Sequence, residues 1–126
     1  MPDWEDDTGI SDEEFLLRRI HPDDIKFDAE GDPYPSGGAF RTQQLSVNIA
    51  SRTTYDAVLA NYPRHSLAAF KVSVVRSEEC IIVSDLEDPT HAMVCRKDDP
   101  HKRLSKPQAY KLASQATLVV YRPPAN

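Results

Sequence analysis

Prolines and glycines divide this chain into short apolar segments. Pro22 ends the first of them, because the residue before a proline is biased away from helical backbone angles. Pro63, Pro89 and the pair Pro123-Pro124 interrupt or end later segments. Residues 23–38 hold two prolines and three glycines, and we predict a loop for them. The chain is therefore expected to form short strands and few helices.

The apolar residues within these segments follow two different periods. Leu45-Ser46-Val47-Asn48-Ile49 alternates apolar and polar side chains, which is typical of a half-buried strand. Further strands are predicted at residues 15–20, 67–75, 81–83, 91–96 and 118–121. Helices are predicted at residues 51–62, where apolar residues recur at helical spacing, and at residues 105–116, where Ser105 is a suitable N-cap. We therefore predict an α+β single domain, with a mainly antiparallel sheet of about five to six strands and about two helices packed on it.

Acidic residues are concentrated at the N-terminus. Residues 1–14 contain seven acidic side chains and no lysine or arginine, whereas residues 15–126 contain thirteen acids and fifteen bases. We expect residues 1–14 to be a flexible acidic arm and residues 15–126 to be the folded domain. Trp4, Asp6 and Asp7 are the candidates for binding a partner protein, through charge and through a pocket that accepts the indole ring.

Several classes of protein are not expected from the composition. No apolar run approaches the roughly 20 residues of a membrane span, and the acidic N-terminus does not resemble an export signal, so we expect a cytoplasmic protein. Cys80 and Cys95 lie in apolar segments and are expected to be reduced and buried. No cofactor and no metal is expected, because His91 and Cys95 would lie about 13 Å apart on a strand.

Six polar residues are candidates for a ligand site, because they lie near the long loop and at strand ends, where sites are often found. They are Arg19, His21, Ser36, Arg41, Ser46 and His91. Their convergence in one pocket would indicate an enzyme or a ligand sensor. The chain has neither the G-x-S-x-G turn of a serine hydrolase nor a phosphate-binding G-x-x-x-x-G-K-[ST] loop, which favours a protein without catalytic activity.

A second candidate surface is basic. Its residues lie near the last predicted helix and comprise Arg96, Lys97, Lys102, Arg103, Lys106 and Lys111. Such a patch is a possible nucleic-acid site, whose affinity would fall steeply with salt. Asp98 and Asp99 dilute its charge, and no aromatic residues alternate with the basic ones to stack on bases.

Four short motifs carry a resemblance to known sequences. They are Arg19-Ile20-His21-Pro22, residues 36–40, Leu45-Ser46-Val47 and His91-Ala92. With these motifs the chain resembles a set of small uncharacterised bacterial proteins. The resemblance implies a bacterial cytosolic protein, encoded near toxin or defence genes, and it implies no established activity.

The early basic residues and the glycine-rich loop are also similar to small ADP-ribosyltransferase-like toxins of the RES type. That similarity implies that Arg19 or His21 would contact a dinucleotide, although the chain lacks a matching catalytic acid on a later strand. Our leading hypothesis from the sequence is a small accessory protein that acts through protein–protein contacts. A nucleotide-handling enzyme or ligand sensor is the first alternative, and a nucleic-acid-binding protein is the second.

Overall fold

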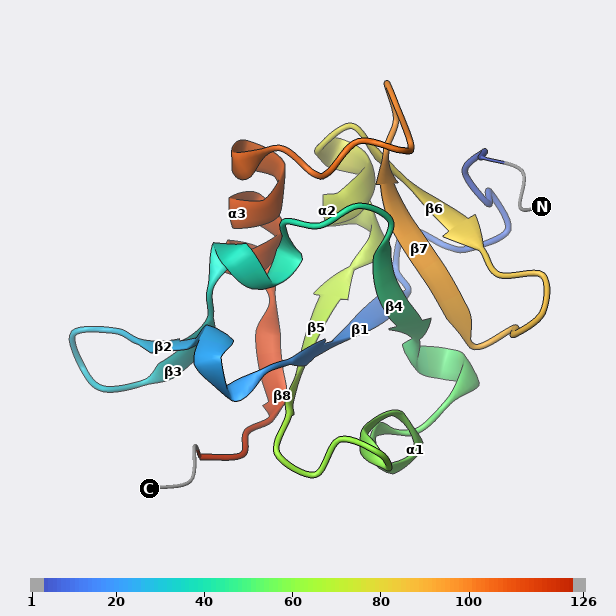
Figure 1. The fold of residues 1–126 in the computed structure, drawn as a ribbon. Coiled ribbons are helices and arrows are strands. Elements are labelled where there is room, and N and C mark those ends of the chain that lie inside the picture. Colours follow the sequence, from blue (N-terminus) through green and yellow to red (C-terminus); the bar gives the residue numbers. More distant parts are fainter. Residues whose placement is uncertain (1–3, 124–126) are drawn as a thin grey trace.

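Strand β4 (Leu45–Ile49) has the two-faced character that its sequence predicts. In the computed structural model, which describes residues 4–123, Leu45, Val47 and Ile49 are buried, while Ser46 and Asn48 are partly exposed. β4 lies between β7 and β1 (Figure 1), and its apolar side chains belong to the main buried cluster of the domain. One face of the sheet is therefore apolar at this strand, and the other face is polar.

Six strands form one antiparallel sheet in the order β6-β7-β4-β1-β5-β8. Besides β4, they are β1 (Phe15–Ile20), β5 (Ser66–Lys71), β6 (Cys80–Ser84), β7 (His91–Arg96) and β8 (Thr117–Val120). The helices are α1 (Tyr55–Leu59), α2 (Val72–Ser77) and α3 (Lys106–Gln115). This architecture confirms the predicted fold class. None of the helices within residues 4–123 has the length and apolar character needed to span a membrane.

The face of the sheet that α2 and α3 cover, here called the inner face, holds the main core. Val72 and Val75 of α2 and Leu112 of α3 pack there against buried side chains of the sheet. Phe40 and Phe70 meet edge to face in this core, with ring centroids 5.4 Å apart. Removing these side chains from water is the main term that favours folding.

The opposite face, here called the outer face, is covered at its two ends. At one end, Val58 and Leu59 of α1 pack on Leu17 and on apolar side chains of β5. At the other end, Trp4 and Met93 pack on a small buried cluster of β6 and β7 side chains. Because β4 lies between these two clusters, its polar side chains occupy the middle of the outer face.

Two predicted elements differ from the structure by more than two residues at one end or both. The strand predicted at residues 67–75 ends at Lys71, and Val72–Ser77 form α2. Val72 and Val75 are one helical turn apart and both are buried, so tertiary packing overrides the strand preference of this valine-rich segment. The helix predicted at residues 51–62 is confined to α1, which follows a 3₁₀ turn at Ala50–Arg52.

The segment predicted to be a loop contains a short hairpin. β2 (Ile25–Phe27) pairs with β3 (Pro33–Pro35), and 3₁₀ turns precede and follow the pair at Pro22–Asp24 and Gly37–Phe40. Prolines are tolerated in β3 because the hairpin is a separate two-stranded sheet, in which a strand edge needs no further N–H donor. The hairpin projects from the side of the domain in Figure 1.

Residues 4–14, which we expected to belong to a flexible arm, are packed on the domain in the structure. β6 is an edge strand, and its exposed backbone groups need partners. The Asp7 N–H donates to the Ile82 carbonyl at 2.8 Å, and the Ile82 N–H donates to the Asp6 carboxylate at 3.0 Å. Arg76 forms ion pairs with Asp6, at 3.1 Å, and with Asp12. These contacts fasten the acidic segment along the edge of the sheet.

The 3₁₀ turn at Gly37–Phe40 joins the hairpin to α3 by close packing. A Cβ atom on Gly37 would lie 2.1 Å from a ring carbon of Tyr110, so the ring would have to move. A Cβ atom on the neighbouring Gly38 would have no atom nearer than 3.7 Å. A side chain at position 37 therefore disturbs the contact between this turn and α3, whereas one at position 38 has room.

We predict that Gly37→Ala destabilises the protein by about 1–3 kcal/mol, because the new methyl group displaces the Tyr110 ring. Urea denaturation measures the effect, and Gly38→Ala is the matched control with little change. Tyr110→Ala removes the obstructing ring, so Gly37→Ala should cost clearly less in that background. Equal costs in the two backgrounds would contradict this account of the packing.

We also predict that docking of the acidic segment weakens in acid. The hydrogen bond from the Ser84 hydroxyl is the largest cause that lowers the pKa of Asp7 below its ordinary value of 3.8. A lowered folded-state pKa stabilises the fold above the ordinary pKa, and this contribution is lost as the pH falls through the folded-state value. Ser84→Ala should therefore cost about 1 kcal/mol at pH 7, and the cost should shrink as the pH falls below 3.8.

Urea denaturation at several pH values measures this dependence. Ser77→Ala is the control, because its hydroxyl contacts the Val74 carbonyl and no carboxylate. A cost of Ser84→Ala that stays constant from neutral pH into strong acid would exclude a role for the Asp7 carboxylate.

Candidate functional site

Ser46, His91 and Asp85 form a continuous chain of hydrogen bonds on the outer face. Ser46 Oγ lies 2.6 Å from His91 Nε2, and His91 Nδ1 lies 3.0 Å from an Asp85 carboxylate oxygen. The two contacts use the two different nitrogens of one imidazole ring. The side chains of His91 and Asp85 are 25% and 31% exposed, so the chain is shielded in part and still reachable from solvent.

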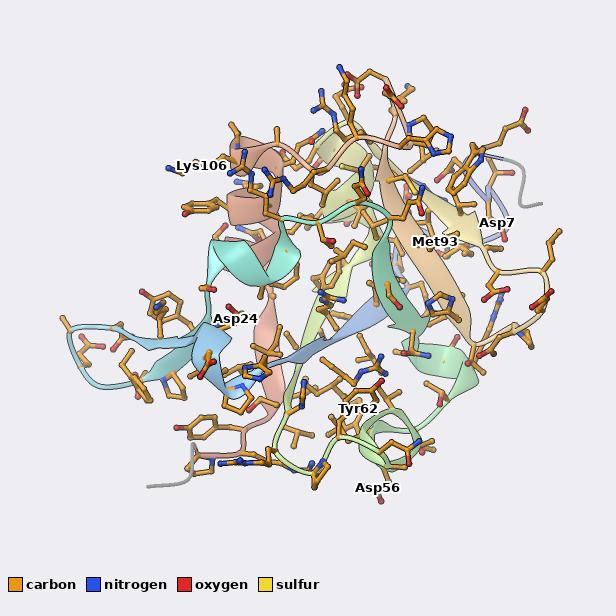
Figure 2. The ribbon with its side chains drawn as sticks, viewed as in Figure 1. Asp7, Asp24, Asp56, Tyr62, Met93 and Lys106 are labelled. Carbon is orange, nitrogen blue, oxygen red and sulfur yellow. The ribbon has the colours of Figure 1, made fainter. Side chains whose placement is uncertain are left out.

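The register of β4 and β7 brings Ser46 and His91 together. His91 lies opposite Asn48, and Met93 lies opposite Ser46. Because side chains alternate along a strand, these four residues point to the same face. His91 reaches Ser46 along the diagonal of the pair, a separation that long side chains can span. Met93, labelled in Figure 2, lies on this outer face, close to Trp4 of the acidic segment.

Asp85 comes from the loop that connects β6 to β7. Its backbone N–H donates to the His91 carbonyl at 3.3 Å, and its carboxylate accepts from the Glu87 N–H at 2.9 Å. The Glu87 hydrogen bond is the largest cause that lowers the pKa of Asp85, and the His91 contact lowers this pKa further. The carboxylate is therefore ionised at neutral pH, and it fixes the orientation of the His91 ring.

Arg18 supports Ser46 from the inner side of the sheet. Its Nη1 donates to the Ser46 carbonyl at 3.1 Å, and its Nε and Nη2 donate to the Ala39 carbonyl at 3.3 and 3.2 Å. Burial is the largest cause that lowers the pKa of Arg18. Arg19, and not Arg18, was among the predicted site residues. Adjacent residues of a strand face opposite sides, so one of the two arginines had to point inward.

Arg19 and His21 make no contact with Ser46 or His91 and instead contact the neighbouring rings of Tyr62 and His65. The Arg19 guanidinium stacks over the Tyr62 ring, 4.0 Å from its centroid. His21 lies beyond the end of β1, and its Nδ1 accepts from the Asp23 N–H. Its ring meets the His65 ring edge to face, with centroids 5.3 Å apart. These two predicted site residues therefore belong to a second cluster.

Ser36 and Arg41 lie on either side of the 3₁₀ turn at Gly37–Phe40. Ser36 borders a groove of roughly 510 Å³ between the hairpin and α3, with Lys26 and Tyr110 among its walls. Arg41 is exposed. The six predicted ligand-site residues therefore do not converge in one pocket, and only Ser46 and His91 among them share a hydrogen bond.

The predicted partner-binding residues make contacts within the chain. Asp6 and Asp7 bind the edge of β6, and Trp4 packs against the apolar cluster of β6 and β7. The indole ring also meets the His101 ring edge to face at 4.9 Å. All three residues are partly exposed in this docked arrangement. That role stays a prediction.

The predicted basic patch is mostly exposed. Arg96 pairs with Asp98 at 2.7 Å, and the Lys106 ammonium lies 5.5 Å from the centroid of the Tyr110 ring. Within residues 4–123, no acidic partner within ion-pair distance is found for Lys97, Lys102, Arg103, Lys106 or Lys111. Nucleic-acid binding by this patch stays a prediction.

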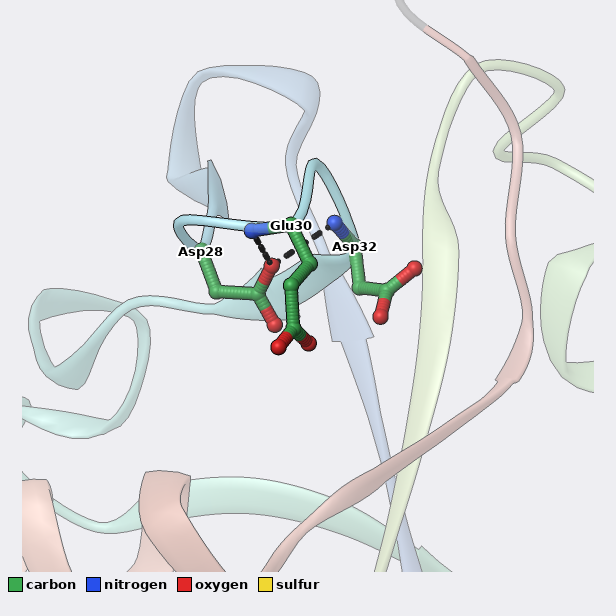
Figure 3. Close-up of side chains that lie close together, drawn as sticks. All are labelled: Asp28, Glu30 and Asp32. Carbon is green, nitrogen blue, oxygen red and sulfur yellow. Dashed lines mark hydrogen bonds between the residues drawn. The ribbon is translucent and has the colours of Figure 1, made fainter.

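Three acidic side chains gather at the tip of the β2–β3 hairpin. Asp28, Glu30 and Asp32 have carboxylate oxygens within 4.8 Å of one another, and all three are exposed (Figure 3). The Asp28 carboxylate accepts from the backbone N–H groups of Glu30 and Asp32, both at 2.9 Å. Closure of the hairpin turn accounts for this arrangement.

The two cysteines are free and buried, as expected. Burial raises the pKa of the Cys80 thiol to about 12 and that of the Cys95 thiol to about 11. Both thiols are therefore protonated at neutral pH. A thiolate is the reactive form of cysteine, so neither residue is suited to act as a nucleophile.

Comparison with known proteins gives no assignment for this site. No protein-family model matches the chain, and no curated protein or solved structure is significantly similar to it. The function must therefore be argued from the geometry of the site itself.

Proposed function

We propose that the protein hydrolyses an ester or a similarly activated acyl compound, with Ser46 as the nucleophile. The observation that carries this proposal is the chain Ser46–His91–Asp85, in which one imidazole contacts both a hydroxyl and a carboxylate. A serine hydroxyl is a weak nucleophile unless a neighbouring base accepts its proton. Recognition of such a unit depends on the roles and geometry of the side chains, and not on their order in the chain.

Each side chain has a definite role in this reaction. When His91 donates its Nδ1–H to Asp85, Nε2 is free to accept the proton of Ser46 Oγ as this oxygen attacks the acyl carbon. His91 then returns the proton to the departing alcohol oxygen, which leaves an acyl group on Ser46. In the second half, His91 takes a proton from water, the resulting hydroxide attacks the acyl carbon, and Ser46 Oγ leaves with the proton that His91 returns.

The negative charge that develops on the acyl oxygen needs a hydrogen-bond donor. β7 pairs with β4 from Leu45 to Asn48, so the backbone N–H groups on that side are used within the sheet, whereas β1 pairs only with Asn48 and Ile49. We assign the donor role to the Asn48 side chain, which lies on the outer face two residues from Ser46 and opposite His91. Its Nδ2 contacts the Thr90 carbonyl at 3.5 Å, a weak hydrogen bond that a substrate oxygen could replace. Amide side chains serve this purpose in other acyl-transfer sites.

We predict that a fluorophosphonate probe labels the protein at Ser46, since such probes react with serines that a base activates. Peptide mass spectrometry locates the label. Ser46→Ala should abolish labelling, and His91→Ala should slow it at least about 100-fold, because general-base catalysis typically contributes 10²–10⁴. Ser114→Ala, which changes an exposed serine on α3, should react like the wild type.

All variants are first compared by thermal unfolding, so that loss of labelling is not caused by loss of structure. Absence of labelling in the folded wild type, or equal labelling of Ser46→Ala, would show that the hydrogen-bond chain only joins the 85–90 loop to β4.

We further predict that Asp85→Asn lowers kcat for hydrolysis of p-nitrophenyl acetate by about 10²–10⁴, while KM changes little. The amide would donate to His91 Nδ1, so the ring proton would lie on Nε2. A protonated Nε2 can no longer accept the proton of Ser46. Initial rates of p-nitrophenolate release, measured by absorbance over a range of substrate concentrations, give kcat and KM. Asp56→Asn on α1 has the same charge change at an exposed position and should retain wild-type kcat. An equal loss in both variants would exclude a specific role for Asp85.

A further inference from the structure

A compact cluster of basic side chains surrounds Tyr62, at the end of the outer face that carries α1 (Figure 2). The Arg19 guanidinium stacks on the Tyr62 ring at 4.0 Å. The His65 ring lies edge to face with the same ring, at a centroid distance of 5.1 Å. Arg122 Nη1 donates to the Tyr62 carbonyl at 2.8 Å, and His21 lies against His65. Three separate parts of the chain, β1, the 60–65 loop and the residues after β8, thus bring two guanidinium groups and an imidazole ring to one place.

The positive charge of this cluster is hardly compensated. Elsewhere in residues 4–123, Arg76 pairs with two carboxylates and Arg96 pairs with one. In the same part of the chain, no carboxylate lies within ion-pair distance of Arg19 or Arg122. Asp23 lies 3.6 Å from His21 and is almost fully exposed, and the charge of Asp24 acts to raise the pKa of Arg18. Although the chain has 20 acidic and 15 basic residues, the acids of residues 4–123 form no ion pair with these two arginines.

The surroundings of His65 support the same conclusion. Burial is the largest cause that lowers its pKa, and the charges of His21, Arg19, Arg122 and Arg18 each lower it further. These neighbouring charges disfavour the protonated form of His65, so the lasting positive charge here belongs to the arginines. Bringing like charges together costs free energy unless an anion joins them. The Arg18 guanidinium donates to carbonyl groups, which are uncharged, so these contacts place no negative charge beside it.

We propose that Arg19, His65 and Arg122 bind the phosphate group of a small phosphorylated molecule. Guanidinium groups match phosphate oxygens with paired N–H donors, and stacking on Tyr62 holds the Arg19 group in one plane. Arg19 directs one weak hydrogen bond, of 3.4 Å, to the Val58 carbonyl, so its other N–H groups remain available for a ligand. The cluster gathers around one ring rather than forming a stripe, which suits a single phosphate better than a nucleic-acid backbone. This site does not depend on the hydrolytic role of Ser46.

The test is titration of the full chain with inorganic phosphate and with glycerol 3-phosphate, followed by NMR of the histidine rings and the arginine Nε–H groups. Sodium chloride at equal ionic strength is the reference. We expect saturable shifts of His65, Arg19 and Arg122, with a Kd of about 1 mM for inorganic phosphate. Tighter binding of glycerol 3-phosphate would identify a phosphate ester as the ligand, and equal affinity would identify free phosphate.

Matched variants separate a built site from general attraction of anions. Arg19→Gln and Arg122→Gln should each weaken phosphate binding at least about 10-fold, because each removes paired donors. Arg103→Gln, an exposed position with the same charge change, should alter it less than about twofold. Ser46→Ala should bind phosphate like the wild type, so the result does not depend on the proposed hydrolysis. Non-saturating shifts spread over all basic residues, or equal effects of Arg19→Gln and Arg103→Gln, would overturn the proposal. If Arg19→Gln does not fold, Arg122→Gln decides.

Discussion

The separation of the two faces of β4 is the constraint on which the rest of the structure depends. Leu45, Val47 and Ile49 fill the inner core, and a shift of one residue in register would turn them outward and bury Ser46 instead. Burying an unpaired hydroxyl while exposing three large apolar side chains would cost several kcal/mol on general grounds. The pairing with β7 is therefore fixed by the core. The same pairing places His91 within 2.6 Å of Ser46, so stability and the candidate site rest on one register.

The acidic segment complements this arrangement from outside the core. An edge strand such as β6 is a template for unwanted pairing, and proteins commonly cover or charge such edges. Asp6 and Asp7 do both, since they occupy the backbone groups of Ile82 and bring carboxylates to the edge. The contact between Asp7 and Ser84 also lies directly beside Asp85, the acid of the hydrogen-bond chain. The segment thus stabilises the end of β6 from which the 85–90 loop departs.

Local patterns in the sequence were sufficient for the strands and for part of the site. The alternation of residues 45–49 identified β4, and Ser46 and His91 were selected as candidates because they lie near the long loop and at strand ends. Asp85 was missed because turn chemistry already explains an aspartate at the start of such a loop. Its approach to His91 depends on how the loop folds back, which no spacing reveals. For Val72–Ser77, the strand preference of valine was outweighed by burial of Val72 and Val75, a tertiary effect that local propensity does not contain.

The outer face also separates charge along its length, in a way that the net charge of −5 conceals. Asp6, Asp7 and Asp85 lie near the β6 and β7 end, and the cations around Tyr62 lie near the α1 end. Charges in salt water are screened beyond about 8 Å, so acids at one end do little to neutralise cations at the other. An anionic ligand therefore responds to the local cluster and not to the acidic protein as a whole. A molecule drawn to the cations around Tyr62 would approach the sheet on the face that carries Ser46. Arg19 follows Leu17 by two residues, so both point to the same face. Leu17 pairs with Asn48, which lies on the face of Ser46.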